Sequence, residues 1–164
     1  MAKLQSRTAI QADREKAALL ISPVEHDHET LRRIFEEQGW TLFTERSIGP
    51  ALTFLHDKAV SIVITERDLP VGDWRAVLEI MYLLADRPLV IVTCRHADNH
   101  LWAEALNLGA YDVLAKPFDR TEVVRILNSA WTRCERALLP GPESAEAPLP
   151  RAAAGSREMV SGVP

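Results

Sequence analysis

The run Val60-Ser61-Ile62-Val63-Ile64-Thr65 indicates the fold class, because a stretch this apolar suits a strand that is buried on both faces. Two further runs have the same character, at residues 17–21 (AALLI) and 89–93 (LVIVT). Strands without polar alternation are typical of a parallel sheet with helices over both faces. We therefore expect an α/β domain built around such a sheet.

Helical patterns alternate with these runs along the chain. Leu31, Ile34 and Phe35 recur at helical spacing, and Gly39 follows as a stop signal. Asp73 is placed to cap a later helix. Five repeated βα units with right-handed crossovers predict a doubly wound three-layer sandwich. The predicted strands cover residues 17–21, 40–44, 60–65, 89–93 and 110–115, and the predicted helices lie around 31–35, 48–55, 74–81, 101–108 and 121–134.

Composition divides the chain into one domain and two flanks. Of the 164 residues, 47% are hydrophobic and 26% are charged, which is enough apolar material for a core. We expect an N-terminal extension at residues 1–16, the domain at 17–138 and a disordered Pro/Ala-rich tail at 139–164. The tail is too short and too rich in proline for a DNA-binding output domain, so we expect a stand-alone module.

Charge and hydropathy exclude several classes of partner. The formal net charge is −4, so we expect no broad nucleic-acid-binding surface. The sequence lacks a long apolar run and an apolar signal core, so we expect a cytoplasmic protein that does not bind membranes. The two cysteines are far apart, and we expect free thiols.

The residues that follow the strands carry a resemblance to a known family. In a doubly wound sheet the functional site lies beyond the carboxyl ends of the strands. Taken in order, the chain from about 17 to 136 resembles the response regulator receiver domain, which implies a flavodoxin-like fold with strand order 2-1-3-4-5. The stretches that match are LLI (19–21), LRRIFEEQGW (31–40), IVITERDLPVGD (62–73), PLVIVT (88–93) and LGAYDVLAKPF (108–118).

The resemblance implies a role for each position at that edge. In the family, an aspartate after the third strand accepts a phosphoryl group from a histidine kinase, and this position holds Glu66. The family's Thr or Ser and its Lys, which bond the phosphoryl oxygens, match Thr93 and Lys116. Two acidic residues after the first strand bind Mg²⁺ in the family, and Ser22 and Pro23 stand there instead. The bond from Lys116 to the next residue, a proline, is a candidate cis peptide.

These departures predict weak or absent Mg²⁺ binding and no cofactor. Magnesium needs hard oxygen ligands, but Ser22 offers one neutral oxygen and Pro23 offers none. Glu66 carries its carboxylate one methylene further out than an aspartate, so the geometry for in-line attack is lost. An alternative is a receiver that is still phosphorylated with Mg²⁺ on Glu66 or on Asp68, which an extended chain places on the same face.

Two interpretations of Glu66 remain open. Its longer side chain could hold negative charge close to Lys116 and Thr93, as a built-in mimic of the phosphoryl group. It could instead be a relic carboxylate that pairs with Lys116. Both fit a module that is not an enzyme and that signals through protein–protein contacts.

The surface used for such contacts is also suggested by the resemblance. In the family, the fourth helix, the fifth strand and the last helix form the output and dimer surface, so a homodimer through these elements is one expected contact. The family's aromatic switch position holds Val113, and we expect Tyr111 on the same face of that strand. Trp102 is either an exposed contact residue or rests on Tyr111.

Two alternatives come from other classes of protein. Histidines and a cysteine in neighbouring loops could form a metal- or redox-sensing module. A flavodoxin-like enzyme is disfavoured, because Ser22-Pro23-Val24 replaces the Gly-rich phosphate loop after the first strand. The side chains of the sensing alternative are His26, His28, His96 and Cys94, and His100 is expected near the same edge.

Overall fold

A five-stranded parallel sheet forms the centre of the computed structural model, which describes residues 16–96 and 98–138. The strand order is β2-β1-β3-β4-β5, as predicted. The strands are β1 (Ala17–Ile21), β2 (Thr41–Glu45), β3 (Ile62–Glu66), β4 (Leu89–Cys94) and β5 (Asp112–Ala115), and the helices are α2 (Glu25–Glu37), α3 (Ile48–Asp57), α4 (Trp74–Leu83), α5 (Asn99–Asn107) and α6 (Arg120–Leu138).

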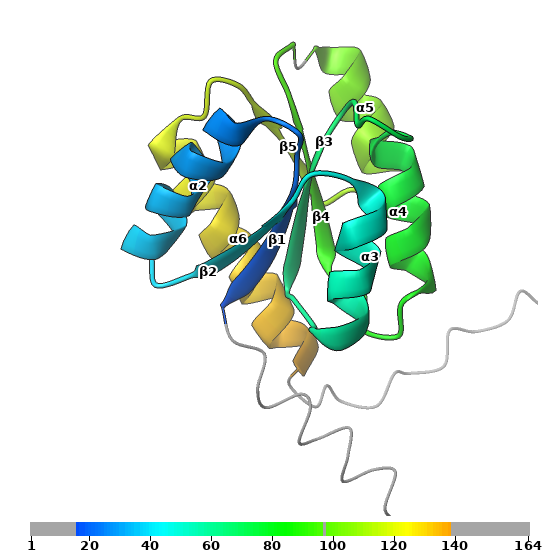
Figure 1. Ribbon diagram of the computed structural model, residues 1–164. Coiled ribbons are helices and arrows are strands. Elements are labelled where there is room, and N and C mark those ends of the chain that lie inside the picture. The colour runs from blue at the N-terminus through cyan, green and yellow to red at the C-terminus, as the bar shows by residue number, and fades with distance from the viewer. Residues whose placement is uncertain (1–15, 97, 139–164) are drawn as a thin grey trace, which may run out of the picture.

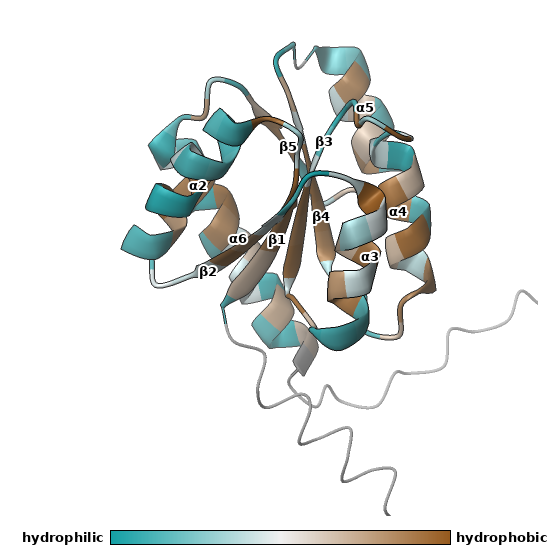
Figure 2. Ribbon diagram, viewed as in Figure 1, coloured by the Kyte–Doolittle hydropathy of each residue, from teal (hydrophilic) through white to brown (hydrophobic). Residues whose placement is uncertain are grey.

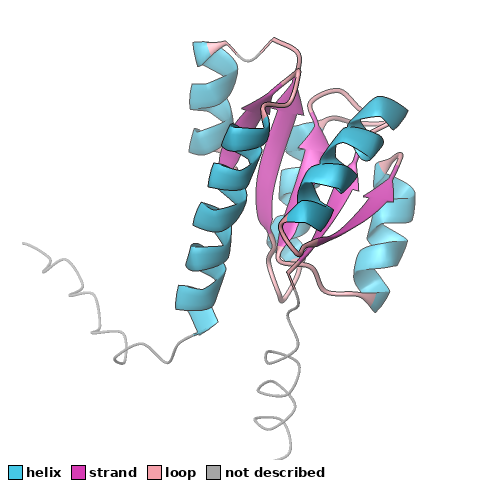
Figure 3. Ribbon diagram, turned by 90° about the vertical axis from the view of Figure 1, so that its left-hand side faces the viewer, coloured by secondary structure: helices cyan, strands magenta, loops and turns pink. Residues whose placement is uncertain are grey.

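Helices cover both faces of the sheet, so the domain has three layers (Figures 1 and 3). Helices α2 and α6 lie on one face, and α3, α4 and α5 lie on the other (Figure 1). The apolar side chains form two cores accordingly, one on each side of the strands. Figure 2 shows apolar strands at the centre and helices that mix apolar and polar residues around them. The three middle strands lack polar alternation because both of their faces are buried.

The structure extends or shortens several predicted elements by a few residues. The last strand begins at Asp112 instead of residue 110, and α6 continues to Leu138. The helix predicted at 101–108 ends one residue earlier, because Leu108 is the C-cap residue of α5 and is 47% exposed. Gly39 and Gly109 follow helices with φ angles of +70° and +101°, a conformation that suits glycine at a helix C-terminus. Of the predicted extension at 1–16 only residue 16 is described, and the predicted tail at 139–164 lies outside the described residues.

Asp73 caps helix α4, as its position in the sequence predicts. Its carboxylate accepts hydrogen bonds from the backbone N–H groups of Arg75 (3.0 Å) and Ala76 (3.2 Å). The Arg75 guanidinium adds a third bond at 2.9 Å. Partial desolvation raises the pKa of the Asp73 carboxyl, but the bonds from Ala76 and Arg75 outweigh it and hold the pKa below its usual value of 3.8.

We predict that Asp73→Ala lowers the free energy of unfolding by about 1 kcal/mol at neutral pH, because two N–H groups of α4 lose their acceptor. Since the folded-state pKa is depressed, the stabilisation by Asp73 is present above the unfolded-state pKa and is lost as the pH falls through the folded-state value. Urea unfolding of both proteins at neutral and acid pH measures this. Asp73→Asn, which keeps a capping oxygen, is the control. If the two proteins differ by the same free energy of unfolding in acid as at neutral pH, this account is contradicted.

Candidate functional site

The ends of three strands bring the predicted site residues together at the carboxyl edge of the sheet. Glu66 is the last residue of β3, and the parallel register places it beside Thr93 of β4. Lys116 follows β5 directly, and its backbone N–H bonds the carbonyl of Cys94 at 2.9 Å. The bond between Lys116 and Pro117 is cis, as predicted. Strand pairing therefore brings residues 50 positions apart in the chain to one point.

A lysine held between two carboxylates forms the centre of this site. The Lys116 Nζ donates to Oε2 of Glu66 and to Oδ2 of Asp27, which lies in the first turn of α2. The three side chains are nearly buried, with exposed fractions of 8% for Lys116, 12% for Glu66 and 6% for Asp27. We call these three residues the carboxylate–lysine triad. Thr93 donates from Oγ1 to the same Glu66 oxygen at 3.3 Å.

Ser22 and His28 fix the position of Asp27. The Ser22 hydroxyl donates to Oδ2 of Asp27 at 3.0 Å, and the Val24 N–H donates to the Ser22 hydroxyl oxygen at 3.2 Å. The Nε2 of His28, a buried side chain, donates to the Ser22 carbonyl at 2.7 Å. The oxygen of Asp27 that faces Lys116 therefore accepts two hydrogen bonds, which lowers the cost of burying its charge.

Asp27 is the residue of this site that the sequence analysis missed. We considered only Ser22 and Pro23 for acidic groups, since these occupy the positions of the family's acidic pair. The sequence did contain a sign that Asp27 is buried. It lies four residues before Leu31, so the two residues share one face of the same helix. The carboxylate that the loop after β1 lacks is thus supplied from α2.

The donor set does not fit a magnesium ion. Mg²⁺ requires near-octahedral oxygen ligands, yet one oxygen of each triad carboxylate already accepts from the Lys116 ammonium. Pro23 has no ligand atom, and the Ser22 hydroxyl donates its proton to Asp27. Within residues 16–96 and 98–138, no group of three or more His, Cys, Asp or Glu side chains is placed to hold a metal ion.

The same finding speaks against the metal-sensing alternative. His26, His96 and His100 are exposed, whereas His28 is buried against the Ser22 carbonyl. Burial raises the pKa of the Cys94 thiol, which keeps it protonated, whereas redox-sensing cysteines need a depressed pKa. The structure therefore gives neither a metal-binding cluster nor an activated thiol among the residues of that alternative.

The remaining predicted site residues lie around the triad without joining it. Asp68 lines the same hollow as Glu66. Its carboxylate is 81% exposed and lies 3.6 Å from Nε of Arg67, not beside Lys116. Val113 is buried in the core under α3, α4 and α5.

Tyr111 was expected on the same face as Val113, and this is wrong. Tyr111 packs against the opposite core, under α2 and α6, and its hydroxyl lies 2.6 Å from Oγ of Ser129. Tyr111 precedes β5, so the alternation of a strand does not extend to it. Trp102, on α5, is 43% exposed and belongs to the other side of the sheet, so it does not rest on Tyr111.

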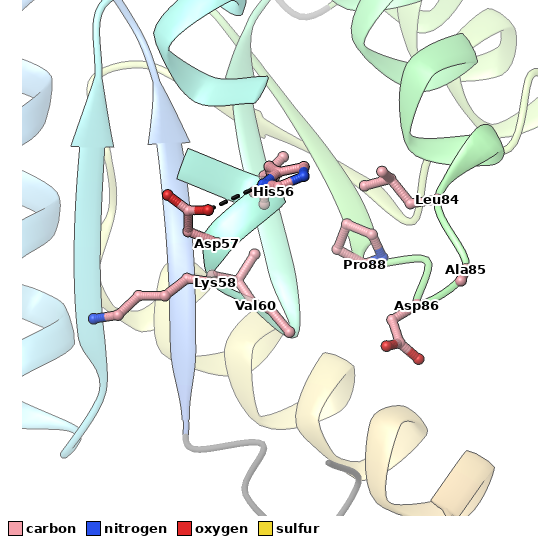
Figure 4. A pocket seen from close by; sticks show the side chains of 10 residues that line it. His56, Asp57, Lys58, Val60, Leu84, Ala85, Asp86 and Pro88 are labelled. Atoms are coloured by element: carbon pink, nitrogen blue, oxygen red, sulfur yellow. Dashed lines mark hydrogen bonds and ion pairs between the residues drawn. The ribbon is translucent and has the colours of Figure 1, made fainter. Parts of the chain in front are cut away.

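A second hollow lies at the opposite edge of the sheet, where α3 and α4 lead into the next strands (Figure 4). It has a volume of about 240 Å³, and its polar side chains include His56, Asp57 and Lys58. The exposed side chains of His56 and Asp57 are hydrogen-bonded, with 3.0 Å between Nδ1 and Oδ1. This hollow shares no residue with the triad.

Comparison with known proteins agrees with the resemblance seen in the sequence. The model of the response regulator receiver domain family matches residues 24–128. The chain is 32% identical over 96 residues to the C4-dicarboxylate transport transcriptional regulatory protein DctD of Rhizobium meliloti, a match that covers 58% of this chain and 21% of that protein. The chain therefore spans about a fifth of the length of this relative.

Solved structures show the same fold. The signal receiver domain of an HD domain-containing protein from Pseudomonas fluorescens Pf-5 is similar at 26% identity with a TM-score of 0.68, covering 76% of this chain and 92% of that one. The beryllofluoride-activated NtrC4 receiver domain dimer is similar at 22% identity with a TM-score of 0.68, covering 73% and 98%. A CheY-like receiver domain protein from Methanospirillum hungatei JF-1 is similar at 17% identity with a TM-score of 0.68, covering 75% and 98%.

We predict that Lys116→Met lowers the free energy of unfolding by about 3 kcal/mol, because it leaves two nearly buried carboxylates without a counter-charge. Asp27→Asn should destabilise the wild type but stabilise the Lys116→Met background, where it removes repulsion between Asp27 and Glu66. Denaturant unfolding of the four proteins in this double-mutant cycle measures the coupling. Lys58→Met, at an exposed lysine, is the control, and additive effects of the two changes would contradict the triad.

Proposed function

The chain belongs to the response regulator receiver domain family, and from this premise we propose that it is an atypical receiver that signals through protein–protein contacts without an aspartyl phosphate. The family assignment places it in two-component signalling. In the described residues, no helix is long and apolar enough to cross a membrane. The proposal concerns the site where the family accepts a phosphoryl group. In this chain that site holds the carboxylate–lysine triad instead of the family's aspartate and acidic pair.

The observation that carries the proposal is the ammonium of Lys116 between Glu66 and Asp27. The resemblance assigns this lysine to the oxygens of an incoming phosphoryl group. Here those contacts are made by carboxylates of the chain, and the hydroxyl of Thr93 donates to Glu66 as well. Both of the groups that would bond a phosphoryl group are therefore already bonded within the protein.

Charge balance supports the same conclusion. Phosphoryl transfer needs a cation that neutralises the charge on the transferred group. In the triad Lys116 is the cation, and the two carboxylates already exceed its charge by one. A phosphoryl group attached at Glu66 would therefore compete with Asp27 for this one ammonium, without the Mg²⁺ ligands of the family's acidic pair. We propose that Mg²⁺ binding is correspondingly weak and that no cofactor is required.

Helix α5 provides the surface that suits a protein partner. Trp102 and Leu106 lie four residues apart on this helix and are 43% and 38% exposed. An exposed tryptophan is a typical anchor of a protein interface, and Leu106 adds apolar area beside it. We propose that partners, including a second copy of this chain, bind across this helix.

We predict that wild-type protein shows no amide chemical shift changes at Glu66, Thr93 or Lys116 with millimolar Mg²⁺ and then beryllofluoride, an acyl-phosphate mimic. The triple variant Ser22→Asp, Pro23→Asp, Glu66→Asp should show saturable Mg²⁺-dependent changes, because it supplies the carboxylates that the resemblance assigns to the ion. Glu66→Asp alone is the matched control and should show no Mg²⁺-dependent change in amide shifts. Saturable changes in the wild type would overturn the proposal and favour phosphorylation on Glu66 or Asp68.

We predict that Glu66→Gln changes the amide shifts of the triad and Thr93 but not those of Val113 or α5, because Asp27 still holds Lys116 in place. This result is expected of a relic carboxylate. Changes that spread to Val113 and Trp102, together with altered self-association in sedimentation, would identify Glu66 as a phosphoryl mimic instead. Glu79→Gln, at an exposed position of α4, controls for the loss of one negative charge.

A further inference from the structure

We propose that the cleft beside the triad binds a small organic anion with an apolar body, such as an aromatic or aliphatic carboxylate. The cleft has a volume of about 390 Å³ and lies between the start of α2, the loop after β4 and the loop after β5. This volume falls within the range of small-molecule sites. The proposal goes beyond the proposed function, since it involves neither a phosphoryl group nor a metal ion.

The walls of the cleft are apolar. The apolar side chains that line it are Val24, Pro117 and Phe118. Val24 and Phe118 are partly exposed, and Pro117 is exposed, so their surfaces are available to a ligand. The Nζ of Lys116 lies 5.9 Å from the centre of the Phe118 ring, which places this wall next to the triad. A hydrocarbon body that displaces water from these side chains would gain free energy in proportion to the area covered.

One arginine and two histidines line the exposed rim of the cleft. His26 comes from α2, and Arg95 and His96 come from the loop after β4. All three are exposed, and their side chains make no hydrogen bond or ion pair with any other residue that the structure describes. An arginine without a partner beside two imidazoles is complementary to a carboxylate, which its planar guanidinium can bind through two hydrogen bonds.

The floor of the cleft does not repel an anion strongly. Asp27 and Lys116 both line it. The Asp27 oxygen that faces Lys116 accepts from the ammonium and from the Ser22 hydroxyl, which reduces its exposed charge. Among the residues that line the cleft, Arg95 is therefore the cation without an acidic partner in the described residues. A ligand would place its apolar body against Phe118 and its anionic group toward Arg95.

The test is a titration of the full chain with naphthoate, followed by amide NMR. We expect saturable shifts at Val24, His96 and Phe118. Naphthalenemethanol, which lacks the charge, should bind about tenfold more weakly, and Arg95→Gln should weaken naphthoate binding by about tenfold, the loss expected for one charge-assisted hydrogen bond. Arg33→Gln, at an exposed arginine of α2 outside the cleft, should leave binding unchanged.

Several outcomes would overturn the proposal. These are the absence of saturable shifts at millimolar naphthoate, equal binding of both probes, and equal effects of the two arginine variants. If inorganic phosphate bound as tightly as naphthoate, the apolar walls would contribute nothing to binding, and the proposal would be wrong. Shifts that follow protein concentration instead of probe concentration would mean that a second copy covers the cleft. None of these results depends on Mg²⁺, so they are distinct from failure of the proposed function.

Discussion

The functional edge, meaning the carboxyl edge of the sheet with the loops that follow its strands, depends on one buried cation. This cation is the ammonium of Lys116 between Asp27 and Glu66. Two nearly buried carboxylates cannot lie this close without a counter-charge, and a lone buried ammonium would be equally costly. The three groups therefore require one another. Because they come from α2, β3 and the loop after β5, this single cluster ties together three parts of the chain that are distant in sequence.

The parallel sheet makes the cluster possible. Its middle strands are covered on both faces, so side chains within the sheet are apolar and only the strand ends can carry charge. Register then decides which charges meet, and it places Glu66 beside Thr93 with Lys116 nearby. The receiver fold supplies this edge, while the residues on it decide the chemistry. In this chain the edge carries an internal ion cluster of Lys116, Asp27 and Glu66.

The triad and the neighbouring cleft divide the functional edge into two parts. The triad is nearly buried and satisfied by its own hydrogen bonds, whereas the cleft is open. Its rim side chains Arg95, His26 and His96 lack acidic partners among the described residues. Lys116 belongs to both. A ligand bound in the cleft would therefore lie next to the ammonium that holds α2 and the strand ends together. It would also lie near helix α5, which begins a few residues beyond Arg95.

The sequence by itself determined the fold and most of the site, because hydrophobic patterns and strand-end motifs are local properties of the chain. The strand order, the α4 cap at Asp73 and the meeting of Glu66, Thr93 and Lys116 all followed from such patterns and from the family resemblance. The role of Asp27 and the face of Tyr111 were decided only by the tertiary structure. An ion pair between a helix turn and a distant strand end depends on how α2 packs, and the start of β5 depends on its pairing with β4, so neither is encoded in the spacing of nearby residues.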